Sequence, residues 1–88
     1  MAEIEITPTA LAELANVPRP VQRRIRDIFV RLQSWPQVSG AKPLRGKLAG
    51  NYRIRTGDYR IVFKVHERTT HDWRVIVWKI GYRGDVYE

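Results

Sequence analysis

Residues 51–63, NYRIRTGDYRIVF, predict two β-strands joined by a tight turn. Polar and apolar side chains alternate on both sides of the Gly57-Asp58 dipeptide, which suits a two-residue hairpin turn. Such a turn places Arg55 directly opposite Arg60. Because successive side chains of a strand point to opposite faces, the hairpin is predicted to have one apolar face and one basic face.

The two predicted faces differ sharply in composition. The apolar face consists of Tyr52, Ile54, Ile61, Phe63 and Val65, and the basic face consists of Arg53, Arg55, Arg60, Val62 and Lys64. Directly opposed arginines repel each other, at a cost of a few tenths up to about 1 kcal/mol. A face that serves only solubility would mix charges of both signs, although arginine stems can also cover apolar surface. We therefore interpret the basic face as an anion-binding surface, with a purely structural charged face as the alternative.

Outward from the hairpin, the sequence predicts an α+β fold. A strand is expected over residues 2–6, a helix that starts at Thr7-Pro8, and a second helix that starts at Pro20 and ends at Trp35. After a loop over 36–50, strands are predicted over residues 51–56, 59–66 and 73–80. The expected architecture is an N-terminal strand, a helical hairpin and a three-stranded antiparallel meander, with the helices packed on one face of the sheet.

The bulk properties limit the classes of function. A chain of 88 residues is expected to form a single domain over residues 1–88. It has no cysteine, no signal-peptide pattern and no apolar run long enough for a membrane span, so we expect a cytoplasmic protein without membrane contact. The net charge of +7 indicates a polyanionic partner such as nucleic acid, or an acidic protein. His66 and His71 have no metal-site spacing, and we expect no metal or cofactor.

The last strand and the C-terminal tail add further candidates. We expect Ile76, Trp78 and Ile80 to join the core, and Lys79 and Arg83 to face the basic side. Aromatic rings beside guanidinium groups are typical of surfaces that stack single-stranded RNA bases, and Tyr82 and Tyr87 bracket Arg83 in this way. Further side chains predicted to contact RNA are Arg45, Lys47, Lys64, Lys79 and Tyr82.

The chain resembles the RelE/ParE superfamily of bacterial toxins, and in particular its RelE branch. The resemblance covers nearly the whole chain and is strongest in KPLRGKLAGNYRIRTGDYRIVFKV, residues 42–65, and VWKIGYRGDVYE, residues 77–88. It implies a toxin of a type II toxin–antitoxin system that forms a hetero-oligomeric complex with a cognate antitoxin. It also implies a metal-independent endoribonuclease that cuts mRNA on the ribosome by attack of a 2′-hydroxyl on the adjacent phosphate. The positions that match the family's catalytic pattern are Arg53, Arg55, Arg60, Arg83 and Tyr87.

The resemblance leaves the general base open. RelE has lysines at the positions of Arg53 and Arg55, and arginine cannot lose its proton near neutral pH. Tyr87, with its phenol acidified by neighbouring positive charge, is the first candidate, followed by Lys47 and then Asp85.

Two other functions remain as alternatives. A ParE-like toxin of the same fold would act on DNA gyrase through protein contact and would not need the five catalytic positions together. A basic RNA-binding module without catalysis would explain the absence of a lysine base.

Overall fold

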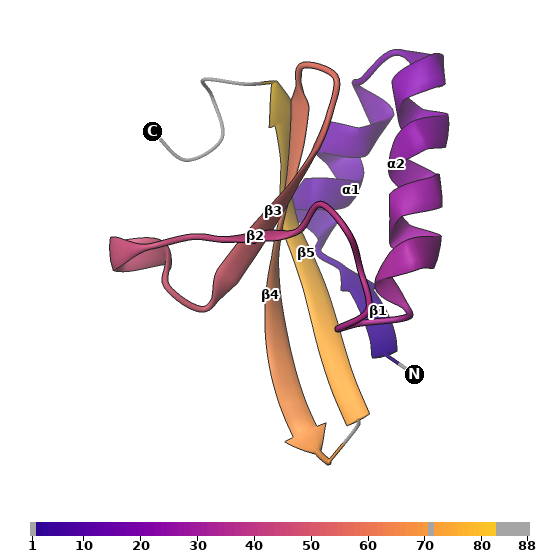
Figure 1. The fold of residues 1–88 in the computed structure, drawn as a ribbon. Helices are drawn as coiled ribbons and strands as arrows, with labels where there is room; N and C mark the ends of the chain where they lie inside the picture. Colours follow the sequence, from indigo (N-terminus) through magenta and orange to yellow (C-terminus); the bar gives the residue numbers. More distant parts are fainter. Residues whose placement is uncertain (1, 71, 83–88) are drawn as a thin grey trace.

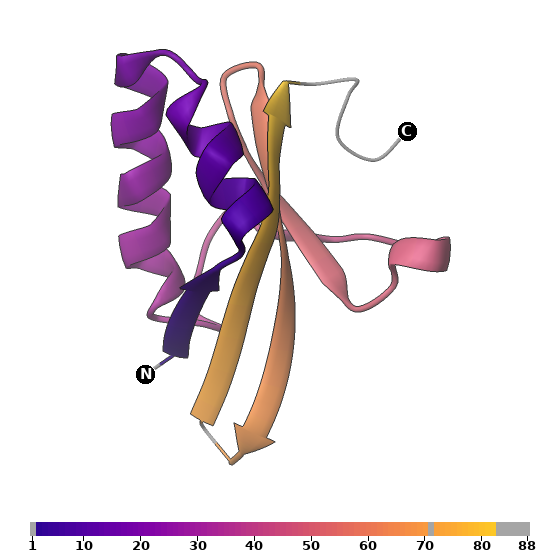
Figure 2. The ribbon, with the colours of Figure 1, turned by 180° about the vertical axis from the view of Figure 1, so that it is seen from behind.

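The computed structural model describes residues 2–70 and 72–82 of the chain. Their elements are β1 (Ala2–Ile6), α1 (Pro8–Ala15), α2 (Arg19–Leu32), β2 (Lys42–Pro43), the 3₁₀ turn η1 (Gly46–Leu48), β3 (Asn51–Thr56), β4 (Tyr59–Thr69) and β5 (Asp72–Tyr82). The strands form one sheet in the order β1-β5-β4-β3-β2. β1 runs parallel to β5, and all other neighbours are antiparallel. Both α-helices lie on one side of the sheet (Figures 1 and 2), which confirms the predicted α+β architecture.

The helices begin where the sequence predicts a start. The Thr7 hydroxyl accepts a hydrogen bond from the backbone N–H of Ala10 at 3.2 Å, and proline occupies the first turn of both helices. α2 begins at Arg19, one residue before the predicted start, and ends at Leu32. Its buried side chains recur at helical spacing and face the sheet: Val21, Ile25, Ile28 and Leu32.

The β3–β4 hairpin has the register that its turn predicts. Arg55 is paired with Arg60, and Ile54 with Ile61. Both isoleucines are buried in the core under the helices. The prediction of one apolar face and one basic face is therefore confirmed for this hairpin.

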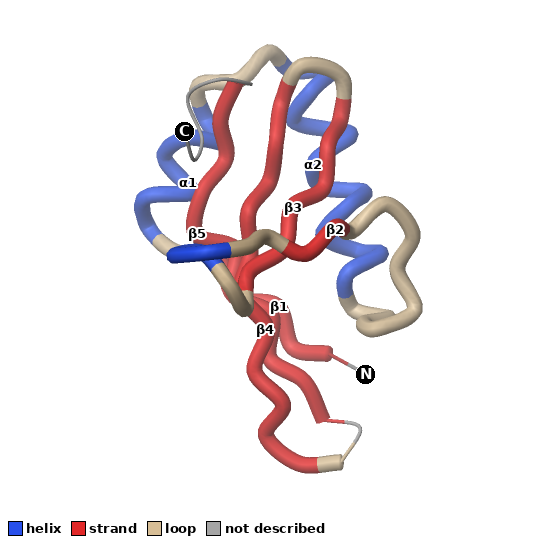
Figure 3. The backbone as a smooth tube through the Cα atoms, turned by 60° about the vertical axis from the view of Figure 1, so that its left-hand side comes forward, coloured by secondary structure: helices blue, strands red, loops and turns tan. Residues whose placement is uncertain are grey.

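The sheet is larger than the predicted meander. β4 ends at Thr69 and β5 begins at Asp72, so this end of their hairpin extends well beyond β2 and β3 (Figure 3). β1 flanks β5 there, with Ala2 paired to Trp73. The segment predicted as a loop over 36–50 contains β2 and η1. β2 exists only because Lys42 and Pro43 pair with β3, and a two-residue strand has no side-chain periodicity of its own.

The prediction for the apolar residues of β5 is wrong in part. Ile80 is buried in the core, but its companions there are Val75 and Val77 rather than Ile76 and Trp78. The cause is an irregularity in the β4–β5 ladder, where the pairing passes directly from Lys79 to Val77. One extra residue on β5 shifts the alternation of side chains. Odd-numbered side chains face the helices before this residue in the sequence, and even-numbered side chains face them after it.

An aromatic cluster closes the core beside the end of α2. The ring of Trp35 packs edge-to-face on Tyr52 and Phe63, with centroid distances of 4.8 and 5.5 Å. Tyr52 and Phe63 are stacked at 5.8 Å. This cluster attaches the segment after α2 to the centre of the sheet. In the described part of the chain, no helix combines the length and the apolar character that crossing a membrane requires.

Glu13 of α1 contacts the edge of β5 that β1 does not reach. β1 ends at Ile6, whose partner on β5 is Val77. Beyond that point, one Glu13 oxygen accepts a hydrogen bond from the Ile80 backbone N–H at 2.9 Å, and the other accepts one from the Lys79 ammonium at 2.5 Å. A single carboxylate therefore takes the place of a neighbouring strand at this edge.

We expect Glu13→Ala to lower the free energy of unfolding by about 1–3 kcal/mol, because the buried Ile80 N–H loses its acceptor. Glu13→Gln keeps an oxygen for that N–H and removes only the charge, so its cost should stay below about 1 kcal/mol. Urea denaturation measures both values. Glu67→Ala, at an exposed position of β4, is the control. A Glu13→Ala protein as stable as that control would contradict the edge-capping role.

Candidate nucleic-acid interface

The basic face lies on the side of the sheet away from the helices. The side chains that alternate with it, among them Tyr52, Ile54 and Phe63, pack into or against the helix-side core. Within the basic face, Arg55 and Lys64 are exposed, Arg53 and Arg60 are half-buried, and Val62 is fully buried. The sheet therefore presents its cations on the surface that the helices leave open.

The cations of the basic face are close neighbours without an acid between them. Arg55 and Arg60 are direct cross-strand partners, and Arg53 is paired with Lys42 of β2 on its other side. Residues 51–56 of β3 and 59–64 of β4 contain no Asp or Glu. Like charges in such positions destabilise a sheet.

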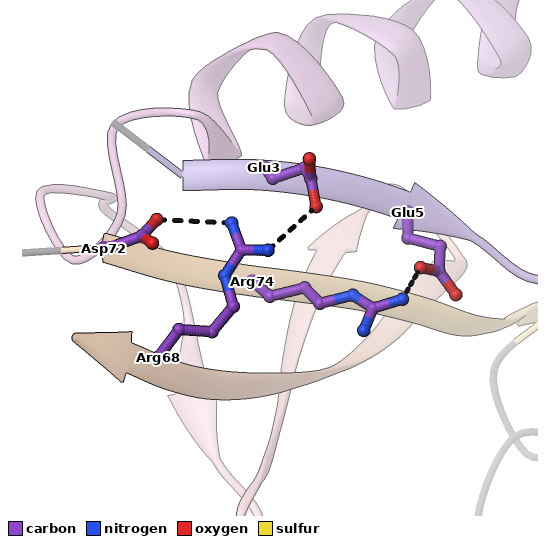
Figure 4. Close-up of polar contacts among 5 residues, drawn as sticks. All are labelled: Glu3, Glu5, Arg68, Asp72 and Arg74. Atoms are coloured by element: carbon purple, nitrogen blue, oxygen red, sulfur yellow. Dashed lines mark hydrogen bonds and ion pairs between the residues drawn. The ribbon is translucent and has the colours of Figure 1, made fainter.

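The far part of the same sheet face is organised differently (Figure 4). Its charged side chains form a paired patch that consists of Glu3, Glu5, Arg68, Asp72 and Arg74. Arg68 contacts Glu3 at 3.4 Å and Asp72 at 3.2 Å, and Arg74 contacts Glu5. The hydrogen bond that Arg74 donates to Glu5, together with the charge of that carboxylate, raises the pKa of Arg74 above its ordinary value. Every guanidinium group in this patch has a carboxylate partner.

The contrast between the two regions bears on the origin of the basic face. Both regions lie on the same face of one sheet, since Glu3 and Glu5 alternate with core-packed Ile4 and Ile6. Acidic side chains are thus interspersed with the arginines where β1 flanks the sheet, whereas residues 51–56 of β3 and 59–64 of β4 contribute no Asp or Glu. A solvated surface with no ligand has no reason for this difference.

A loop over residues 44–50 stands beside the basic face. It contains η1, which projects from the sheet on the side opposite to the helices (Figures 1 and 2). Arg45 and Lys47, two predicted RNA contacts, are exposed on this loop. Gly46 and Gly50 have φ angles of 66° and 94°, which permit the tight turn into and out of η1.

Asn51, which the sequence analysis did not select, connects this loop to the sheet together with Trp78, which was expected in the core. The Asn51 amide donates a hydrogen bond to the Leu48 carbonyl at 3.1 Å and accepts one from the Trp78 indole N–H at 2.8 Å. Asn51 is the one buried polar residue in the described part of the chain. Its place directly after Gly50, at the start of a strand that alternates polar and apolar side chains, is the only sequence signal for this role.

The structure does not bring Lys79 and Tyr82 onto the basic face. The ammonium of Lys79 is held at the sheet edge by Glu13. Tyr82 follows the orientation of Ile80, which faces the helices, and its ring packs edge-to-face on that of Tyr59 at 5.5 Å. Of the side chains predicted to contact RNA, Lys79 thus has its ammonium at the sheet edge and Tyr82 lies on the opposite face.

Arg83, Asp85 and Tyr87 lie outside the described residues, and their assignments stay predictions. Within the described ranges, no group of three or more His, Asp or Glu side chains could hold a metal ion. The site that the structure does assemble consists of the basic face and the loop with Arg45 and Lys47.

Comparison with known families gives a match over nearly the whole chain. Residues 4–87 match the family described as the ParE toxin of type II toxin–antitoxin system, parDE. The match includes all the elements described above except the first two residues of β1.

Individual proteins show the same likeness. Toxin RelG of Mycobacterium tuberculosis is 26% identical over 84 residues, which cover 96% of this chain and 93% of RelG. Toxin RelE of the same organism is 34% identical over 65 residues, 73% of this chain and 66% of that protein. The crystal structure of the toxin–antitoxin complex RelBE2, also from M. tuberculosis, has a TM-score of 0.76 at 26% identity, over 92% of this chain and 96% of that chain.

We expect Arg55→Gln to raise the free energy of unfolding by roughly 0.2–1 kcal/mol at low salt, because it removes the repulsion from Arg60. The same change at Arg68, which has two carboxylate partners, should lower it by up to about 1 kcal/mol. Both effects should shrink at high salt, where charges are screened. Thermal melts at two salt concentrations measure them. If Arg55→Gln is clearly destabilising at low salt, the repulsion account is wrong.

Proposed function

The chain belongs to the RelE/ParE superfamily of type II toxin–antitoxin toxins, and we propose that it is an endoribonuclease that cuts mRNA on the ribosome. Its substrate is then the RNA backbone, a polyanion that suits a chain of net charge +7. The catalytic residues in this proposal are Arg53, Arg55, Arg60, Arg83 and Tyr87.

The opposition of Arg55 and Arg60 is the observation that carries the proposal. The two side chains are cross-strand partners, and residues 51–56 and 59–64 of their strands contain no Asp or Glu, whereas the paired patch combines arginines with carboxylates of β1 and β5. The repulsion costs stability, and functional sites commonly retain such costs. A phosphate between two guanidinium groups would turn this repulsion into attraction, because each group can donate two parallel hydrogen bonds to phosphate oxygens.

The proposed reaction is a transesterification within the RNA. The 2′-oxygen forms a bond to the adjacent phosphorus as it loses its proton, and the bond from phosphorus to the 5′-oxygen breaks. The products are a 2′,3′-cyclic phosphate and a 5′-hydroxyl end, and the 5′-oxygen takes up a proton. Arg55 and Arg60 stabilise the charge that develops on the non-bridging oxygens, and Arg83 assists the leaving 5′-oxygen.

The proton acceptor for the 2′-hydroxyl is the least defined role. Arginine stays protonated near neutral pH, so Arg53, Arg55 and Arg60 cannot act as the base. We assign the role to the Tyr87 phenol, whose acidity would be increased by the surrounding positive charge. Lys47 is the next candidate, since it lies on the loop beside the basic face.

RNA binding around the reacting phosphate is assigned to the neighbouring cations. Lys64 belongs to the basic face, and Arg45 and Lys47 extend it along the loop. Lys79 and Tyr82 are left out of the proposed surface, because the structure places them at the β5 edge and on the helix side.

We propose a cognate antitoxin as the protein partner, as in the RelBE2 complex that this chain resembles. A face whose charged side chains are all cations suits an acidic or amphipathic segment that covers it and excludes RNA. The natural unit would then be a hetero-oligomeric toxin–antitoxin complex.

A gyrase-directed toxin is the second candidate, and the family match favours it, since the matched family is described as the ParE toxin. Such a toxin acts through protein contact and has no need for opposed arginines on one hairpin. We therefore rank it below the ribonuclease. A basic RNA-binding module without catalysis ranks third.

We expect Arg60→Gln to reduce mRNA cleavage by about 10²–10³-fold, because one donor to the charged transition state is lost. Primer extension on a translated message after brief expression measures the cuts. Arg68→Gln, in the paired patch of the same sheet face, is the matched control and should cut at the parent rate.

The same assay distinguishes the candidate functions. Codon-phased cuts by the parent protein support the ribosome-dependent nuclease. Intact messages with induction of the DNA-damage response would instead indicate the gyrase toxin. Intact messages without that response would indicate the non-catalytic module.

We expect Tyr87→Phe to lower the cleavage rate and leave RNA affinity nearly unchanged, because the ring is kept and only the phenolic oxygen is lost. Single-turnover cleavage and equilibrium binding separate the two effects. If the phenylalanine protein cleaves at the parent rate, Tyr87 is not the proton acceptor and Lys47 becomes the first candidate.

A further inference from the structure

A buried amide lies at the base of the loop that carries Arg45 and Lys47. The side chain of Asn51 has one partner on each side, the Trp78 indole and the Leu48 carbonyl. An indole N–H can only donate and a carbonyl can only accept, so the orientation of the amide is set by its two partners. Reversing it would break both hydrogen bonds.

Asn51 holds the loop at both ends. Its backbone carbonyl accepts a hydrogen bond from the Leu44 N–H at 2.8 Å, and its side chain binds the carbonyl of Leu48. Within the loop, the Leu48 N–H bonds to the Arg45 carbonyl at 3.2 Å. Among the described residues, the Asn51 amide makes the one side-chain hydrogen bond that reaches residues 44–50.

Trp78 anchors this amide across the sheet. It is the extra residue of the β4–β5 irregularity, and β4 lies between its strand and β3. The indole therefore spans β4 to reach Asn51 at 2.8 Å. A tryptophan N–H usually finds a hydrogen-bond partner when it is buried, and here that partner is the Asn51 amide on β3. Through this bond, the position of the loop is tied to β5 as well as to β3.

We propose that Asn51 and Trp78 are positioning residues that hold the 44–50 loop, and with it Arg45 and Lys47, in place to contact the RNA backbone beside the basic face. The inference rests on the proposed RNA substrate and extends it to a second element of the surface. A loop that is ordered before binding loses little conformational freedom when it binds. Without the hydrogen bond to Asn51, the loop would have to become ordered when RNA binds, and this would lower the affinity for RNA.

The test measures affinity for a fluorescent 2′-O-methyl RNA oligonucleotide, which cannot be cleaved at its 2′-oxygens, over a range of salt concentrations. For single strands the slope of log K against log salt changes by about 0.7 for each phosphate contact. Asn51→Ala should weaken binding severalfold and reduce the slope by up to about 1.4, as two contacts are lost. The combined change of Arg45 and Lys47 to glutamine should have the same effect.

A double-mutant cycle separates positioning from general stability. Added to the Arg45→Gln, Lys47→Gln protein, Asn51→Ala should cause no further loss of affinity, because the groups it positions are gone. Added to Arg55→Gln, its effect should be additive, since Arg55 lies on β3 and not on the loop. Trp78→Phe keeps an aromatic ring and removes the indole N–H, so it should shift affinity in the same direction by a smaller factor.

The outcomes are distinguishable. If the parent protein binds the oligonucleotide and both Asn51→Ala and Trp78→Phe bind with the parent affinity and slope, the positioning role is wrong and RNA binding stands. A role in stability alone would lower the melting temperature and leave the salt slope unchanged, which would also overturn the proposal. A parent protein without affinity for the oligonucleotide would overturn RNA binding by the basic face, and the positioning role with it.

Discussion

The register of the β3–β4 hairpin is the constraint on which the surface of this protein depends. Gly57 adopts a φ of 60° in the two-residue turn, a conformation that costs glycine little. A slip of one residue would exchange the two faces and expose Ile54 and Ile61. Burying each isoleucine contributes about 1.5–3 kcal/mol, whereas the repulsion between Arg55 and Arg60 costs at most about 1 kcal/mol. The core therefore holds the two arginines together against their charge.

Charge on the open face of the sheet is arranged in two different ways. In the paired patch, carboxylates from β1 reach guanidinium groups of the long β4–β5 hairpin and neutralise them. Around the basic face there is no such strand, because β1 pairs with β5 only as far as Val77. Topology thus confines the acidic strand to one end of the sheet. The cations at the other end create a positive electrostatic field, which is complementary to a polyanion or an acidic antitoxin segment.

A single extra residue in β5 has consequences on both faces of the sheet. It brings Val77 into the core and directs the Trp78 indole to Asn51 on the opposite side. Just beyond it, Lys79 lies at the edge where Glu13 can bind its ammonium. The irregularity therefore links core packing, the anchoring of the cationic loop and the capping of an open strand edge. Such bulges commonly re-aim side chains close to functional surfaces.

What the sequence by itself determined is local: the N-terminal cap of α1 at Thr7, the two-residue turn, and the opposition of Arg55 and Arg60. Each depends on residues within a few positions of one another, so alternation and turn chemistry were sufficient to predict them. The sequence also carried the family resemblance, which comparison over residues 4–87 confirms. The tertiary structure alone decided which side chains of β5 face the core, the pairing of β2, and the partners of Asn51 and Glu13. These features join segments that are distant along the chain, since Glu13 and Lys79 are 66 positions apart. No local pattern encodes them, because a strand's pairing and a buried polar group's partner exist only once the chain has folded.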